Sequence, residues 1–242
     1  MTTIVVPTPA GAVPAHLAIP DALADADAQT HPDGSRPGVV VIHEAFGLNH
    51  EIRGHADRFA GRGYLAVAPD LFSYGPRLRC IRDTFRSLLR REGPAFDVLD
   101  AVAGWFAARE DCTGRVGVIG YCMGGGFALL AAPRPAFAVA SVNYGVVPKD
   151  AAELLRGACP VVGSYGAQDR VLRGAAGRLE AALTAAGVEH DVKEYPGAGH
   201  GFLNTHTGPL AVLENLMGAG YRPGPAQDAQ RRIDDFFSQH LS

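Results

Sequence analysis

The sequence lacks the features of an exported or membrane-inserted chain. Its first 20 residues contain no positively charged segment ahead of an apolar stretch, so we expect no secretory signal. No run reaches the roughly 18 apolar residues of a transmembrane helix. Cysteine is scarce, with four in 242 residues and no CxxC pair, which favours free thiols in a reducing compartment over a disulfide framework. We therefore expect a cytoplasmic, globular protein.

Strong positive charge and the common cofactor motifs are also missing. The formal net charge is −3, and no basic patch carries interleaved aromatic residues, so neither nucleic acid nor an anionic membrane is an expected partner. The glycine-rich turn at 120–126 matches neither the P-loop nor the dinucleotide fingerprint, and His43-Glu44 lacks the HExxH continuation of a zinc site. We expect no cofactor and no metal. The oligomeric state stays open, with a monomer favoured.

Short apolar runs alternate with helical patterns along most of the chain. This alternation predicts an α/β fold, with a mostly parallel central sheet covered by helices on both faces. A chain of this length is compatible with one domain, which we predict for residues 1–242. We expect an opening hairpin over 3–6 and 15–19, a surface loop over 21–36, strands over 38–43, 64–68, 116–121, 137–144, 161–166 and 188–195, and helices over 49–62, 95–109, 172–186 and 227–240.

Candidate functional residues follow the predicted strands. Chemistry in such sheets gathers at the carboxyl ends of the strands. Glu44, Cys122, Asp169 and His200 each come directly after a predicted strand. The sequence therefore predicts that these four side chains meet at one edge of the sheet.

Cys122 lies in the pattern of a nucleophile elbow. In this sharp strand-to-helix turn the flanking residues must be small, and Gly120-x-Cys122-x-Gly124 meets that demand with cysteine as the nucleophile. The next residue, Met123, would open the helix, and its backbone N–H would be available to stabilise an oxyanion.

The partners that a nucleophile needs follow in the order of the elbow folds. Cys122 is succeeded by Asp169 and then by His200, which lies between glycines. The imidazole would take the thiol proton, and the carboxylate would fix the imidazole tautomer. The other three cysteines and the remaining histidines are expected to be structural or solvated.

The segments GYCMGGG, GAQD, GAGHGF and VVVIHEAFGLN together resemble the dienelactone hydrolase family, which has the α/β-hydrolase fold. The resemblance implies a carboxymethylenebutenolidase-like activity, the opening of the lactone ring of dienelactone. It implies that Cys122 is the nucleophile, His200 the base and Asp169 the group that orients it. It also implies that Glu44 interacts with the thiol and helps to ionise it, and that Ala45 N–H is the second oxyanion donor.

The resemblance also suggests residues for substrate binding. The family binds the substrate carboxylate with arginines, one of which matches Arg77 or Arg79, with Arg82 as a weaker third candidate. The second family arginine corresponds to Asn204, which offers no charge and weakens the assignment of dienelactone as substrate. Aromatic candidates for the pocket wall are Phe46, Tyr144 and Tyr165.

Three hypotheses about function follow. The first is a cysteine-dependent hydrolase of a lactone or enol ester, acting through an acyl-thioester. The second is a carboxylesterase or thioesterase with the same triad and a neutral substrate, which the uncharged Asn204 favours. The third is a non-enzymatic ligand receptor or thiol sensor built on the hydrolase scaffold.

Overall fold

The computed structural model describes residues 2–9, 11–20, 34–205 and 220–242, which build one eight-stranded sheet. The strands stand in the order β1-β2-β4-β3-β5-β6-β7-β8. β2 is antiparallel to both of its neighbours, β1 and β4. The six strands β4, β3, β5, β6, β7 and β8 run parallel to one another. Their bounds are β1 Thr2–Thr8, β2 Gly11–Ala18, β3 Arg36–Ile42, β4 Leu65–Pro69, β5 Cys112–Tyr121, β6 Val139–Asn143, β7 Val161–Gly166 and β8 His190–Tyr195.

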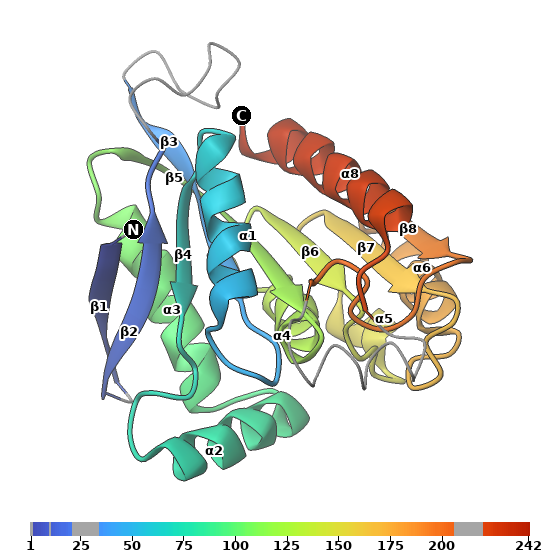
Figure 1. Ribbon diagram of the computed structural model, residues 1–242, viewed down its shortest axis with the longest axis horizontal. Coiled ribbons are helices and arrows are strands. Elements are labelled where there is room, and N and C mark those ends of the chain that lie inside the picture. Colours follow the sequence, from blue (N-terminus) through green and yellow to red (C-terminus); the bar gives the residue numbers. More distant parts are fainter. Residues whose placement is uncertain (1, 10, 21–33, 206–219) are drawn as a thin grey trace.

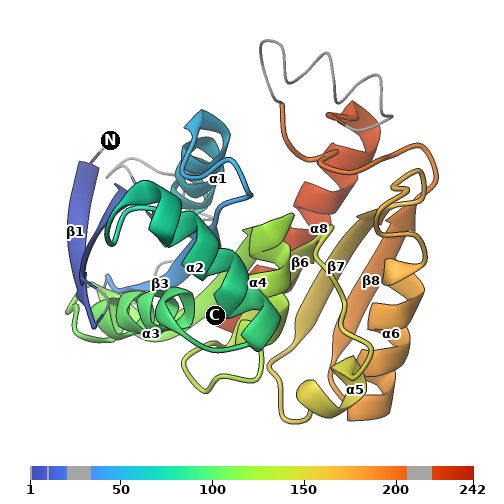
Figure 2. The same cartoon turned by 90° about the horizontal axis from the view of Figure 1, so that it is seen from below.

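Helices cover both faces of the sheet (Figures 1 and 2). The helices α1 and α8 lie on one face, and α3, α4, α5 and α6 lie on the other, while α2 lies beyond the carboxyl ends of the strands. Their bounds are α1 His50–Gly61, α2 Arg77–Arg90, α3 Pro94–Ala107, α4 Met123–Ala131, α5 Ala151–Leu154, α6 Ala175–Ala186 and α8 Pro223–Leu241. The predicted α/β-hydrolase fold is confirmed.

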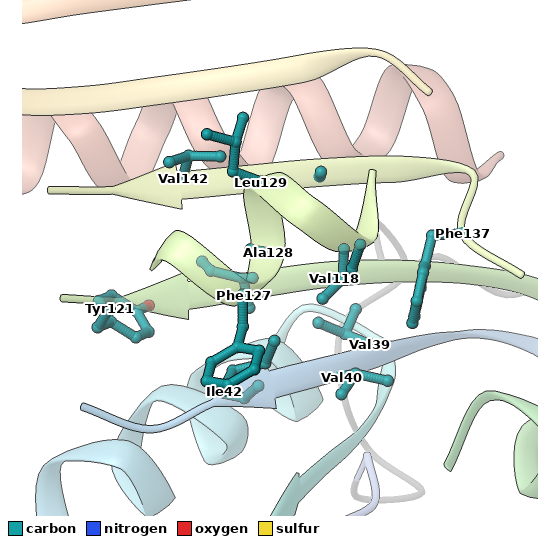
Figure 3. Close-up of a cluster of buried hydrophobic side chains, with 14 of the residues drawn as sticks. Val39, Val40, Ile42, Val118, Tyr121, Phe127, Ala128, Leu129, Phe137 and Val142 are labelled. Carbon is teal, nitrogen blue, oxygen red and sulfur yellow. The ribbon is translucent and has the colours of Figure 1, made fainter. Parts of the chain in front are cut away.

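The core lies on both sides of the central strands. In Figure 3, Phe127 of α4 lies beside Ile42 of β3, and Leu129 of α4 lies beside Val142 of β6. Val39, Val40 and Ile42 are fully buried, because a central parallel strand is covered on both faces and therefore reads as a continuous apolar run. On the α8 side, a Cβ at Gly117 would lie 2.7 Å from the Phe237 ring, so the missing side chain is what lets α8 approach β5 closely.

The predicted elements are present, with shifted ends. The hairpin, the parallel strands and the four predicted helices all appear. The helix predicted over 172–186 begins only at Ala175. Most of the predicted loop over 21–36 lies outside the described residues, and a single domain over 1–242 stays a prediction. Within the described ranges, no helix is both long and apolar enough to cross a bilayer.

Phe237→Ala tests the docking of α8. The side chain is fully buried against β5, so we expect the free energy of unfolding to fall by about 3–5 kcal/mol. Urea denaturation measures it. Val5→Ala, at a side chain that is 60% exposed on the edge strand β1, is the control and should stay within about 0.5 kcal/mol of the wild type. Equal effects of the two substitutions would contradict this account of the core.

Candidate active site

The four residues predicted to meet do lie at one edge of the sheet. Glu44 follows β3, Cys122 follows β5 and Asp169 follows β7, while His200 follows β8. These strands are parallel, and they are consecutive in the sheet apart from β6, which lies between β5 and β7. Their carboxyl ends therefore meet at the edge that points toward α2 in Figure 1.

Cys122 occupies a strained turn. Its backbone has φ 55° and ψ −114°, a conformation that costs a non-glycine residue about 1–3 kcal/mol and persists only where the surroundings enforce it. The surroundings are glycines: a Cβ at Gly120 would lie 1.9 Å from the Gly124 carbonyl oxygen, and one at Gly124 would lie 2.3 Å from the Ile42 carbonyl oxygen. The start of α4 is thereby pressed against the end of β3, and Met123 N–H lies in the first turn of the helix.

His200 and Asp169 form a hydrogen-bonded pair. His200 Nδ1 lies 2.7 Å from Asp169 Oδ2. The other carboxylate oxygen accepts the backbone N–H groups of Val171 at 2.9 Å and Leu172 at 3.1 Å. Burial works to raise the pKa of Asp169, but the hydrogen bond and charge of His200 and the two backbone donors outweigh it and lower that pKa. Asp169 is therefore a fixed carboxylate that orients the imidazole.

His200 also contacts the predicted nucleophile. Burial works to lower its pKa, but hydrogen bonds with Asp169 and Cys122 outweigh burial and raise the pKa to about 10. The Tyr144 ring meets the imidazole edge to face, with 5.2 Å between centroids. Because 32% of the His200 side chain stays exposed, the imidazole is accessible from solvent while its orientation is fixed. The structure thus brings Cys122, His200 and Asp169 together.

Glu44 is buried and held by two amide side chains. It is 2% exposed, and its two carboxylate oxygens accept hydrogen bonds from Asn49 Nδ2 at 3.1 Å and from Asn204 Nδ2 at 2.9 Å. The oxygen of the Asn49 amide caps α1 by accepting the N–H of Ile52 at 3.0 Å. Asn49 therefore fixes both the start of α1 and the orientation of Glu44. It belongs to the VVVIHEAFGLN segment, but its tie to Glu44 was not predicted.

Asn204 lies behind Glu44 instead of facing a substrate. Its side chain is fully buried. While its amide nitrogen donates to Glu44, its oxygen lies 2.8 Å from His55 Nε2. The His55 ring stacks on Tyr121 with 4.1 Å between centroids. Burial lowers the pKa of His55 to about 4, so the neutral imidazole donates its Nε2–H to Asn204. The predicted contact of Asn204 with a substrate carboxylate does not fit this arrangement.

His43 fixes the peptide that precedes Ala45. The buried ring accepts Leu71 N–H at Nε2, at 3.0 Å, so its proton is on Nδ1, which lies 2.7 Å from the Glu44 carbonyl oxygen. Burial lowers the pKa of His43, which is consistent with this neutral tautomer. In a trans peptide the C=O and N–H bonds point in opposite directions. Holding the Glu44 carbonyl toward His43 therefore aims Ala45 N–H the other way.

The predicted arginines separate into two groups. A guanidinium nitrogen of Arg77 lies 3.6 Å from the position a Cβ at Gly47 would take, beside the loop that carries Glu44. Arg79 and Arg82 instead pair with Asp83, at 3.5 and 3.0 Å. Arg77 is thus the better placed candidate of the three.

The aromatic candidates also differ in their surroundings. Phe46 is 46% exposed, whereas Tyr144 and Tyr165 are buried, and the Tyr165 hydroxyl donates to the Gly145 carbonyl oxygen at 3.1 Å. Within the described ranges, no cluster of three or more His, Cys, Asp or Glu side chains is arranged so that it could bind a metal ion.

The parallel sheet, the strained turn after β5 and the histidine after β8 define an α/β-hydrolase fold. The model of the dienelactone hydrolase family matches residues 25–241. The "Putative carboxymethylenebutenolidase" of Yersinia pestis is 30% identical over 97% of this chain and 86% of its own length. The protein of that name from Salmonella typhimurium is 32% identical over 86% of this chain and 79% of its own length.

Solved structures agree with the sequence comparisons. The "Putative Dienelactone Hydrolase" of Klebsiella pneumoniae superposes with a TM-score of 0.72 at 27% identity and covers 98% of both chains. The esterase Est2 of Thermogutta terrifontis shares the fold, with a TM-score of 0.64 at 17% identity over 98% of this chain and 93% of its own. The chain belongs to the dienelactone hydrolase family and is a hydrolase, so the non-enzymatic hypothesis is set aside.

Gly124→Ala tests the packing of the elbow. The added methyl group would meet a backbone oxygen that cannot move aside, so we expect a loss of at least about 2 kcal/mol in the free energy of unfolding. Gly104→Ala, at an exposed position in the last turn of α3 where an added Cβ would meet no other atom within 4 Å, is the matched control and should gain about 0.5–1 kcal/mol. Thermal or urea unfolding measures both, and a Gly124→Ala protein as stable as the wild type would contradict the close approach.

His55 predicts a loss of stability in acid. Its pKa is about 4 in the fold against 6.5 for the free group, so its contribution is fully present above pH 6.5 and is lost as the pH falls through 4. A difference of this size amounts to about 3 kcal/mol.

Urea denaturation at pH 7 and pH 4 measures that contribution. The wild type should lose about 3 kcal/mol more between the two pH values than His55→Gln does. His50→Gln, at an exposed histidine on the same helix, controls for the loss of an imidazole. The same pH dependence in the wild type and in His55→Gln would contradict the assignment.

Proposed function

We propose that the protein is a cysteine-dependent hydrolase of a lactone or ester that works through an acyl-thioester. The observation that carries this proposal is the position of His200, which is hydrogen-bonded to Asp169 at 2.7 Å and lies close enough to Cys122 for the thiol to raise the pKa of the imidazole. That is the relation of nucleophile, base and orienting acid that acyl transfer requires.

The reaction has two steps. His200, whose raised pKa favours the imidazolium, holds the proton of Cys122 while the sulfur attacks the substrate carbonyl carbon as a thiolate, and the oxyanion forms. The carbon–oxygen bond then breaks, and the imidazolium returns the proton to the leaving oxygen, which leaves the acyl group on sulfur. Water, deprotonated by His200, attacks the thioester. A second oxyanion collapses to release the carboxylate and restore the thiol.

Two backbone amides would hold the oxyanion. Met123 N–H is in the first turn of α4, where the amide is not used by the helix itself, and Ala45 N–H is directed away from His43 by the peptide that His43 fixes. One donor of this kind is typically worth about 3 kcal/mol of barrier. His43 acts on this site through the Glu44–Ala45 peptide and is in our proposal a positioning residue.

Glu44 would influence the ionisation of the thiol. A carboxylate next to a thiol opposes formation of the thiolate, since like charges repel. It favours the thiolate only when it accepts the proton or moves aside. The two amides that hold Glu44 from either side support a defined resting position for this carboxylate, from which substrate would displace it.

The substrate assignment depends on Arg77. Curated relatives bear the name carboxymethylenebutenolidase, which supports a dienelactone-like substrate with an anionic carboxylate. Asn204 is buried, and Arg79 and Arg82 pair with Asp83, which supports Arg77 as the residue that would bind that carboxylate. Because a single arginine would have to bind the substrate carboxylate, a neutral ester or thioester is the second candidate substrate.

A reducing cytoplasm would suit this chemistry. All four cysteines, including Cys122, are free thiols in the structure, and the proposed nucleophile is active only while it stays reduced. We propose a monomer of cytoplasmic location that acts on a small-molecule ester or lactone and needs no cofactor.

Steady-state hydrolysis of cis- and trans-dienelactone beside p-nitrophenyl acetate tests the proposal. We expect turnover by the wild type and a loss of at least about 10³-fold in kcat for Cys122→Ala, since the acyl-enzyme cannot form. Mass spectrometry of the acid-quenched protein should show the acyl adduct in the wild type only. Hydrolysis that survives in Cys122→Ala would overturn the mechanism.

Arg77→Gln separates the two substrate classes, with Arg79→Gln as its matched control. For an anionic substrate, kcat/KM should fall about 10-fold or more in Arg77→Gln and stay unchanged in Arg79→Gln. Turnover of p-nitrophenyl acetate alone, equal in both variants, would assign the enzyme to neutral esters.

A further inference from the structure

The helix α2 presents three large apolar side chains to solvent. Leu78 and Leu89 are 85% and 83% exposed, and Phe85 is 39% exposed. Spacings of seven and four residues place these three on one side of the helix, and we call them the α2 stripe. In Figure 2, α2 lies in front of α3 and α4, at the surface of the molecule.

The side of α2 that faces the protein carries small buried residues, and Ile81 and Leu88 next to them are partly buried against the core. Cys80, Thr84 and Ser87 are buried there. The Thr84 hydroxyl donates to the Leu71 carbonyl oxygen at 2.9 Å and the Ser87 hydroxyl to the Asp83 carbonyl oxygen at 2.8 Å. A helix that packs on a protein core ordinarily turns its apolar side inward. Here the most exposed apolar side chains point outward, which is the arrangement of a surface that binds something else.

The same helix concentrates positive charge. It carries five arginines and one aspartate, on a chain whose net charge is −3. Four of the arginines converge on an open groove of about 490 Å³ beside the stripe, which Asp83 and Glu92 also line; the four are Arg79, Arg82, Arg86 and Arg90. Net charge averages over the whole chain and hides this local excess.

We propose that α2 docks on an anionic lipid surface, with the stripe entering the boundary of the acyl chains and the arginine groove receiving lipid phosphates. A helix with Leu and Phe on one side and arginines flanking them is the type that lies in the plane of such a surface. Guanidinium groups bind phosphate oxygens in a bidentate manner. The adjacent apolar and phosphate-binding surfaces match the two parts of a phospholipid.

A second copy of the chain fits this surface less well. Pairing two α2 stripes about a two-fold axis would bring two helices, each with five arginines and one aspartate, against each other, and like charges in an interface oppose association. Arg79 and Arg82 share Asp83 as an ion-pair partner, and a lipid surface would supply negative charge to Arg86 and Arg90 as well.

Docking through α2 would bring the candidate active site close to the lipid. α2 follows β4 at the same sheet edge as Glu44 and Cys122. Phe46, Val146 and Val171, which are 46%, 56% and 85% exposed, come two residues after Glu44, Tyr144 and Asp169 at that edge. Exposed apolar side chains are therefore also present on the loops around the site.

Co-sedimentation with vesicles tests the proposal on the full chain. One set of vesicles is phosphatidylcholine alone, and the other contains one third phosphatidylglycerol. We expect at least about 10-fold more bound protein on the anionic vesicles, and a loss of at least about 5-fold for the double variants Leu78→Ser/Leu89→Ser and Arg86→Gln/Arg90→Gln. Val5→Ser, exposed on β1, and the exposed Arg156→Gln are the matched controls and should bind as the wild type does.

Two further readouts keep the outcomes separate. Leu78→Ser/Leu89→Ser should retain p-nitrophenyl acetate hydrolysis within about two-fold, so failure of vesicle binding and failure of the proposed hydrolase function are distinguishable. Light scattering should give the same mass for the wild type and for this variant. No preference for anionic vesicles would overturn the proposal, as would binding that survives loss of the leucines, or a wild-type dimer that this variant converts to a monomer.

Discussion

The close approach of α4 to the ends of β3 and β5 is the constraint on which the site depends. It requires glycine at 120 and 124, because a side chain at either position would overlap a backbone carbonyl. The same contact forces Cys122 into its positive φ and leaves its backbone bonded to neighbouring elements, with the N–H donating to Asn143 O at 3.1 Å and the carbonyl accepting from Gly126 at 3.2 Å. Main-chain packing thus fixes the position of the Cys122 thiol, and the loops that carry His200 and Asp169 have only to bring those side chains to it.

A second constraint is a buried polar chain that runs from Glu44 through Asn204 to His55. Each member supplies what the next one needs: the carboxylate accepts, the amide both donates and accepts, and the neutral imidazole donates. Buried polar groups of this kind are stable only when every member is paired. The amides of Asn49 and Asn204 thereby hold the buried Glu44 carboxylate at the sheet edge.

Local signals predicted the elements and the triad, and long-range contacts account for what was missed. The runs at 39–42 and 116–121 are apolar because they are central strands, and the glycines around Cys122 are close neighbours in sequence. By contrast, Asn204 and Glu44 are 160 residues apart, so no spacing rule connects them. The late start of α6 has a local cause that the pattern concealed: Asp169 takes the N–H groups of Val171 and Leu172 for its own carboxylate.

The anchoring of the Glu44–Ala45 peptide by His43 has a consequence for how such a site changes during evolution. One substitution can remove a catalytic side chain. A backbone N–H is present in every residue except proline, so almost any substitution at that position leaves it in place. Selection on the two proposed amide donors therefore acts at a distance, on the groups that aim them: the imidazole that fixes one peptide and the glycines that fix the other. The residues that selection would constrain in order to keep this oxyanion site are therefore ones that need not contact the substrate.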